Sequence, residues 1–197
     1  MNYDAILQEV KNQLSNDKTS LHEWNKNYFD LQKERYLKDL EYFSKLKNVN
    51  KVLEIGAAPF HLSLCLKKAG FDITVLDIAP ERFNWFIKEN SLDVKKTDIE
   101  LDDISQYKNT FDLIILTEVF EHLRINPIQT LQKIQGTLKS GGYLYLTTPN
   151  FYRFANLYSF FKGKGIVNGY YEFEKLERLG HMGHVREYTK EEVSLFL

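Results

Sequence analysis

Short apolar runs alternate with helical stretches from Asn50 to Thr148, and this alternation constrains the fold more than any other feature of the sequence. The runs read KVLEI, DITVLD, LDV, FDLIIL and YLYLTT. They are too short for stable helices and mostly apolar on both faces, which is typical of strands buried inside a parallel sheet. Strands separated by helices form βαβ units. The sequence therefore predicts an α/β fold with a doubly wound, mainly parallel sheet.

Amphipathic helices are expected between these strands and before them, because apolar residues recur there every three or four positions. Those between the strands carry Leu62, Cys65, Leu66 and Ala69, then Phe83, Phe86 and Ile87, then Ile128, Leu131, Ile134 and Leu138. The first 46 residues are expected to be helical, with an apolar face of Leu21, Trp24, Tyr28, Leu31, Leu37, Leu40 and Phe43. We divide the chain into an N-terminal helical cap, residues 1–48, and an α/β domain, residues 49–197.

Composition and charge exclude several classes of protein. The 197 residues are 43% hydrophobic, enough for one buried core, and the single cysteine, Cys65, has no partner for an internal disulfide. The first residues lack the charged-then-apolar pattern of a signal peptide, and no apolar run approaches the roughly 20 residues that span a membrane. A net charge of −1 provides no basic field for polyphosphate. We expect a cytoplasmic protein without a membrane span, and nucleic acid is not the expected partner.

The turns after the strands are the expected place for a ligand, because doubly wound sheets bind ligands at the carboxyl ends of their strands. The first turn holds Gly56 and small residues ahead of a helix, so a ligand can approach its backbone closely. The second strand ends at Asp77, about 20 residues later, where an acid can accept hydrogen bonds from ribose hydroxyls. Asp98 follows the third strand, placed to take an adenine amino group while the Ile99 backbone supports the ring edge. These positions predict an adenosine-containing cofactor; a tight packing turn and a turn-capping Asp98 are the alternatives.

Five motifs in order resemble those of the class I S-adenosylmethionine-dependent methyltransferases. The first to fourth are VLEIGAAPFHLSL, VLDI with its Asp77, TDIE and FDLIILTEVFEHL, and the helix and strand that follow are PIQTLQKIQGTLKSGGYLYLTTPN. The similarity runs from about Lys51 to Asn150, and HVREYTKEEVSLFL resembles a later segment. The resemblance implies S-adenosylmethionine as cofactor and a Rossmann-like fold. It also implies a final pair of strands, which are missing from this sequence.

The resemblance also implies roles for individual residues. Glu54 is expected near the methionine amino group, Gly56 and Ala57 under the cofactor, Asp77 on the ribose, Asp98 and Ile99 on the adenine, and Ile78 and Thr117 as further cofactor contacts. The first motif of the family usually carries three glycines, whereas this chain has Gly56, Ala58 and Phe60. The Phe60 ring is expected to crowd the methionine end of the cofactor unless it turns into the interface between sheet and helix.

The turn after the fourth strand carries the most informative chemistry. Glu118, Glu121 and His122 have the i, i+3, i+4 spacing that brings side chains to one face of a helical turn. Two carboxylates and an imidazole are ligands for a divalent cation such as Mg²⁺ or Mn²⁺. The Glu-x-x-Glu-His pattern is similar to that of ubiquinone-biosynthesis O-methyltransferases and plant small-RNA 2′-O-methyltransferases, where it implies metal binding.

A further histidine belongs to the pattern of the small-RNA enzymes. His184, in the segment His-Val-Arg-Glu-Tyr-Thr, matches it, and His181 is the competing candidate. The predicted metal ligands are therefore Glu118, Glu121, His122 and His184. Without a metal, Glu118 contacts the cofactor and His122 or His184 is the catalytic base, since imidazole titrates close to neutral pH. Both interpretations predict oxygen as the methyl acceptor.

An aromatic-rich stretch follows the fifth strand, at about 151–180, where this family usually places a substrate cover. It contains Phe151, Tyr152, Phe154, Tyr158, Phe160, Phe161, Tyr170 and Tyr171, with Arg153, Lys162 and Lys164 interleaved. Aromatic faces with a few cations suit a sugar ring, a quinone-like ring or a phosphorylated small molecule. For most of these rings, however, we expect packing over the N-terminal helices.

The sequence thus predicts an enzyme, an O-methyltransferase acting on a hydroxyl of a small molecule or glycan, with divalent metal assistance as an added hypothesis. RNA 2′-O-methylation is an alternative, which the neutral charge disfavours. A methyltransferase-like binding module without catalysis is another. A Rossmann oxidoreductase is less favoured, because a dinucleotide needs room for its pyrophosphate and this turn keeps one glycine.

Overall fold

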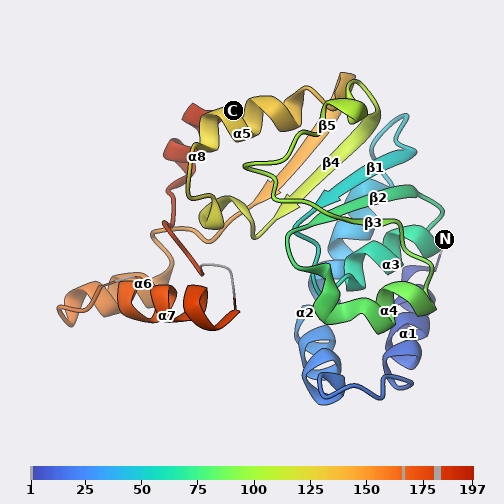
Figure 1. The fold of residues 1–197 in the computed structure, drawn as a ribbon, viewed down its shortest axis with the longest axis horizontal. Coiled ribbons are helices and arrows are strands. Elements are labelled where there is room, and N and C mark those ends of the chain that lie inside the picture. The colour runs from blue at the N-terminus through green and yellow to red at the C-terminus, as the bar shows by residue number, and fades with distance from the viewer. Residues whose placement is uncertain (1, 166, 180–182) are drawn as a thin grey trace.

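A five-stranded parallel sheet with strand order β3-β2-β1-β4-β5 forms the centre of the computed structural model, which describes residues 2–165, 167–179 and 183–197 (Figure 1). The strands are β1 (Lys51–Ile55), β2 (Asp72–Asp77), β3 (Val94–Lys96), β4 (Phe111–Thr117) and β5 (Leu138–Thr147). Each neighbouring pair runs parallel, so all carboxyl ends lie at one edge. The predicted doubly wound parallel sheet is confirmed.

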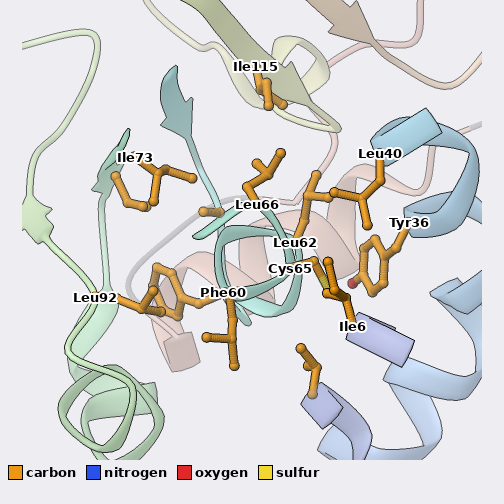
Figure 2. Packing of buried hydrophobic residues seen from close by; sticks show 14 of the residues in the cluster. Ile6, Tyr36, Leu40, Phe60, Leu62, Cys65, Leu66, Ile73, Leu92 and Ile115 are labelled. Carbon is orange, nitrogen blue, oxygen red and sulfur yellow. The ribbon is translucent and has the colours of Figure 1, made fainter. Parts of the chain in front are cut away.

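Helices cover both faces of the sheet, as expected for βαβ units (Figure 1). They are α1 (Tyr3–Leu14), α2 (His22–Phe43), α3 (His61–Lys68), α4 (Asn84–Glu89), α5 (Pro127–Gln135), α6 (Phe154–Phe161), α7 (Gly169–Leu179) and α8 (Lys190–Phe196), with the 3₁₀ turns η1 (Pro80–Phe83), η2 (Ser105–Tyr107) and η3 (Phe120–His122). Val52 of β1 packs with α1–α3, whereas its neighbour Leu53 packs with α5 and α8. Figure 2 shows Leu66 of α3 directed toward Ile115 of the sheet, while Tyr36 of α2 packs on the other side of the helix.

The N-terminal cap consists of two helices rather than one continuous helical segment. A turn between α1 and α2 is fixed by the buried Asp17 carboxylate, which accepts hydrogen bonds from the Thr19 amide and the Asn25 side chain. The expected apolar face of α2 is partly wrong, because Leu31 is 80% exposed. Leu40 and Phe43 are buried as expected, and Phe29 and Tyr36, which were not expected there, complete the buried face toward α3.

Three predicted segments shift by a few residues. β3 begins at Val94 instead of Leu92, and the buried Leu92 lies in the preceding turn. The helix expected to include Leu138 ends at Gln135, where Gly136 caps it, and Leu138 begins β5. Phe83 ends a 3₁₀ turn ahead of α4. No helix among the described residues is both long and apolar enough to cross a bilayer.

Helices α6 and α7 project away from the N-terminal helices (Figure 1). The expected packing of the aromatic rings over those helices is therefore wrong. Most of these rings face solvent, including Tyr152, Phe154, Tyr158, Phe160, Phe161, Tyr170 and Tyr171. Their sequence is apolar enough for a core, but the loop after β5 carries them to the opposite side of the molecule from α1 and α2.

Candidate cofactor and metal site

A cavity of about 320 Å³ opens at the carboxyl ends of the strands, where doubly wound sheets bind ligands. It brings together residues from the turns after β1, β2, β3 and β4. Among the predicted site residues, Gly56, Asp77, Ile78, Asp98, Ile99, Glu118 and His122 line it. One cavity therefore joins the predicted cofactor turns to the histidine of the predicted metal cluster.

Gly56 allows a close approach of backbone segments at the first turn. Its φ of +69° is in the left-handed region, and its amide donates to the Leu76 carbonyl at 2.8 Å. A Cβ on Gly56 would lie 2.3 Å from Cγ2 of Val119. Phe60 is fully buried and packs edge-on against Phe83 at 5.8 Å between ring centroids, so its ring has turned into the core (Figure 2).

Asp77 is buried at the end of β2 and holds its carboxylate at the cavity wall. Its two oxygens accept hydrogen bonds from the amides of Ala58, at 3.0 Å, and Ala79, at 2.9 Å. Each carboxylate oxygen has a second acceptor position. Asp77 is therefore fixed in place and still able to accept hydrogen bonds from ribose hydroxyls.

Asp98 caps its own turn, as the alternative interpretation of the sequence predicted, and it also has a partner that the sequence did not reveal. Its carboxylate accepts from the Glu100 amide at 3.0 Å and forms an ion pair with Arg124, a cation that also lines the cavity. The backbone amide of Arg124 donates to the Glu100 carboxylate at 3.0 Å. Ile99 is buried beside this group. An adenine amino group at Asp98 would share the carboxylate with Arg124.

A second, smaller cavity of about 40 Å³ adjoins the glycine turn and contains Glu54, the residue expected near the methionine amino group. Glu54, Gly56, Ala57 and Thr117 line it together with Arg35 of α2 and Glu118. Glu54 is buried and accepts a hydrogen bond from the Ser63 hydroxyl at 2.5 Å. Burial raises the pKa of the Glu54 carboxyl to about 8.

Glu118 does not share a helical face with Glu121 and His122, so this expectation is wrong. Its φ of +55° places it ahead of η3 in a different backbone conformation. The Glu118 carboxylate accepts from Thr147 Oγ1 at 2.9 Å and lies 3.7 Å from Nη1 of Arg35. Glu118 therefore lines both cavities and is not part of the cluster of Glu121, His122 and His184.

Glu121, His122 and His184 form a compact cluster, in which one potential ligand atom of each lies within 4.8 Å of the others. Nε2 of His122 is 4.0 Å and Nε2 of His184 is 3.9 Å from Oε1 of Glu121. The segment carrying His184 is held in place because the Val185 amide donates to the Glu121 carbonyl at 2.8 Å. His181, the competing candidate, lies outside the described residues.

Glu121 is the most deeply buried member of this cluster. Thr148 donates to its Oε2 at 2.9 Å, whereas its buried Oε1 has no hydrogen-bond partner among the described residues. Burial raises the pKa of the Glu121 carboxyl above its ordinary value. Nδ1 of His122 lies 2.8 Å from the Gly183 carbonyl, so this nitrogen must carry the proton to make a hydrogen bond. The Nε2 lone pair is then available to the cluster.

A family model described as a methyltransferase domain matches residues 27–192, most of the chain. The chain belongs to this methyltransferase family. The ordered motifs of the sequence are thereby explained, and the family predicted from them is confirmed. The methyltransferase domain contains every residue predicted for the cofactor and the metal.

Individual known proteins are also similar to this chain, at low sequence identity. The ubiquinone biosynthesis O-methyltransferase of Xanthomonas campestris pv. campestris (strain B100) is 28% identical over 105 residues, which cover 51% of this chain and 43% of that protein. The chain spans about half the length of the curated relatives it matches. The YcgJ protein of Bacillus subtilis superposes with a TM-score of 0.59 at 17% identity, over 83% of this chain and 66% of that one.

A SAM-dependent methyltransferase from Archaeoglobus fulgidus has a TM-score of 0.51 at 20% identity, over 78% of this chain and 73% of that one. At such identities the solved structures show the shared fold. They do not extend to the acceptor, the metal or the role of each side chain.

Three charged residues near the predicted site residues were not predicted from the sequence. Arg35 reaches Glu118 from α2, Arg124 reaches Asp98, and the buried Glu187 lies 3.5 Å from His184. Arg35 and Arg124 have no motif of their own. Glu187 stands inside the His-Val-Arg-Glu segment, so its spacing from His184 was the available signal.

Proposed function

We propose that this methyltransferase domain binds S-adenosylmethionine and transfers its methyl group to a hydroxyl of a small molecule or glycan. The observation that carries the proposal is the shared cavity, which is lined by Gly56 and Asp77 at one part and by His122 at another. A cofactor over the glycine turn is thus near a group that can take a proton. The O-methyltransferase name of the curated relatives supports oxygen as the acceptor.

The cofactor would be held by the residues of the two cavities. Asp77 would accept hydrogen bonds from the ribose, and Gly56, which lines both cavities, would lie under the cofactor. In the smaller cavity the Glu54 carboxyl group offers an acceptor oxygen to the methionine amino group, while Arg35 is a cation suited to the methionine carboxylate. S-adenosylmethionine supplies an electrophilic methyl group on a sulfonium, which reacts with a positioned oxygen.

The histidine cluster fits a divalent cation. Oε1 of the buried Glu121 has no hydrogen-bond donor among the described residues. The Nε2 atoms of His122 and His184 lie 4.0 and 3.9 Å from that oxygen. Glu121, His122 and His184 would hold the ion, and two imidazoles with one carboxylate suit Zn²⁺ or Mn²⁺ better than Mg²⁺, which prefers oxygen ligands. A bound cation would lower the pKa of the acceptor hydroxyl.

Without a bound cation, His122 is the alternative group for the proton transfer. With Nδ1 of His122 facing the Gly183 carbonyl, Nε2 can accept the acceptor's hydroxyl proton. With that proton taken by His122, the acceptor oxygen would be ready to receive the methyl group of the sulfonium, which would leave as S-adenosylhomocysteine. Glu121, buried beside the imidazole, would stabilise its positive charge. The exposed aromatic rings of α6 and α7 would pack against a ring-containing acceptor and cover it.

Calorimetric titration of S-adenosylmethionine and S-adenosylhomocysteine into the purified protein tests the proposal. Binding of both ligands is the expected result, followed by transfer of a labelled methyl group to a panel of catechols, phenols and sugars. If neither ligand binds, the cofactor assignment is wrong. If both bind and only RNA is methylated, the domain is a nucleic acid enzyme. Binding without transfer to any acceptor supports the binding-module alternative.

A further inference from the structure

The segment that carries His184 is fastened to the loop after β5. Asn150 and Tyr188 form a parallel bridge, and the Phe151 amide donates to the Tyr188 carbonyl at 2.9 Å. Glu187 directly precedes Tyr188, and its side chain is 1% exposed. A carboxylate buried this deeply requires charged or hydrogen-bonding partners.

The partners of Glu187 come from the beginning of α6. Nη2 of Arg153 donates to Oε1 of Glu187 at 2.6 Å, and the Asn156 amide donates to Oε2. Arg153 and Asn156 are also joined to each other, through Nε and Oδ1 at 3.0 Å. The first turn of the projecting helix is therefore tied to this carboxylate.

The same carboxylate faces His184. Oε1 of Glu187 lies 3.5 Å from Nδ1 of His184, while Nε2 of the ring lies 3.9 Å from Glu121. A carboxylate beside Nδ1 favours the proton on that nitrogen and leaves the Nε2 lone pair for the cluster. His122 has the same arrangement, with the Gly183 carbonyl behind its Nδ1.

We propose that Glu187 is a positioning residue that sets the Nδ1-protonated form of His184 and also anchors α6 through Arg153 and Asn156. The inference rests on the proposed function, in which Nε2 of His184 serves the metal or the acceptor. One buried carboxylate thus sets the proton position on His184 and holds the beginning of α6, the first helix of the aromatic-rich stretch.

Nitrogen-15 NMR of histidine-labelled protein tests the first part, because a protonated and a bare Nδ1 have well-separated shifts. The spectrum needs neither cofactor nor metal, and His184→Gln assigns the signal. At about pH 8.5, where an ordinary imidazole is neutral, the wild-type His184 should carry its proton on Nδ1. Glu187→Leu should move the proton to Nε2, whereas Glu187→Gln, which keeps an acceptor oxygen, should retain it. A bare Nδ1 in the wild type overturns the proposal, even if Glu187→Leu fails to fold.

Hydrogen exchange of the α6 amides tests the second part. Arg153→Ala should speed exchange over 154–161 at least tenfold while His184 keeps its Nδ1 proton. Arg186→Ala is the matched control, since it removes an exposed ion pair with Glu192 in the same segment and should leave both readouts unchanged. Unchanged α6 exchange in Arg153→Ala, or equal effects of the two arginine variants, refutes the anchoring. Calorimetry with S-adenosylmethionine on the wild type tests the proposed function separately. If the cofactor does not bind, the proposed function is wrong, while the NMR and hydrogen-exchange results for Glu187 remain valid.

Discussion

Gly56→Ala should destabilise the protein by about 2–5 kcal/mol, as the sum of two separable effects. An alanine at φ of +69° is strained, which costs about 1–2 kcal/mol. Its Cβ would also lie 2.3 Å from Cγ2 of Val119, far inside a normal carbon contact, and overpacking of this kind costs about 1–3 kcal/mol. The loss is measured as the free energy of unfolding in urea.

A second substitution separates the two effects. Val119→Ala removes Cγ2, and the other atoms nearest to the added Cβ belong to the same valine, so no clash remains. In that background Gly56→Ala should cost only the strain, about 1–2 kcal/mol. The cycle should therefore show a coupling of about 1–3 kcal/mol between the two sites. Strictly additive effects, or a Gly56→Ala variant as stable as the wild type, would refute the assigned turn geometry.

Four further predictions follow from individual side chains. Asp77→Ala should weaken S-adenosylmethionine binding by about 1.5–3 kcal/mol in calorimetry, and unchanged affinity removes Asp77 from the site. Glu121→Gln should weaken calorimetric Zn²⁺ or Mn²⁺ binding at least tenfold, and EDTA should abolish turnover; activity that resists EDTA contradicts metal assistance. Glu54 keeps its proton to about pH 8 when folded and loses it near its ordinary value when unfolded, so unfolding free energy should fall as pH rises through this window. Glu54→Gln should flatten that slope in urea titrations, and an unchanged slope counts against the assignment. His61 is buried with both ring nitrogens unpaired among the described residues, so His61→Phe should raise the unfolding free energy by about 1–3 kcal/mol, most clearly in acid; a loss of stability argues against it.

The sheet was predictable because its residues obey a local rule. Strands such as β4 are apolar on both faces over a short run, and nothing outside the run is needed to recognise them. Their carboxyl ends then fix where Gly56, Asp77 and Glu118 lie, since parallel strands end at one edge. The edge of the sheet where the cavity opens could thus be predicted from spacing and motif.

The predictions that depended on helical periodicity were less secure. Leu31 fits an apolar stripe in the sequence, yet the face of α2 that α3 covers is set by Phe29 and Tyr36. Glu118 fits an i, i+3 pattern with Glu121, but a left-handed residue and a 3₁₀ turn replace the helix there. Periodicity assumes a regular backbone, and turns at functional sites are where regular backbone ends.

The missed residues follow from the charges of the predicted ones. The half-buried Asp98 and the exposed Glu118 lie at the same edge of the sheet without a predicted base beside either, and carboxylates gathered at one cavity are stabilised by nearby cations. The structure supplies Arg35 to the first and Arg124 to the second, each from a helix or turn remote in sequence. That cations would gather near these acids is an expectation the acids alone support. Which arginines meet it depends on how α2 and the turn after η3 pack, and no local pattern of the chain encodes that.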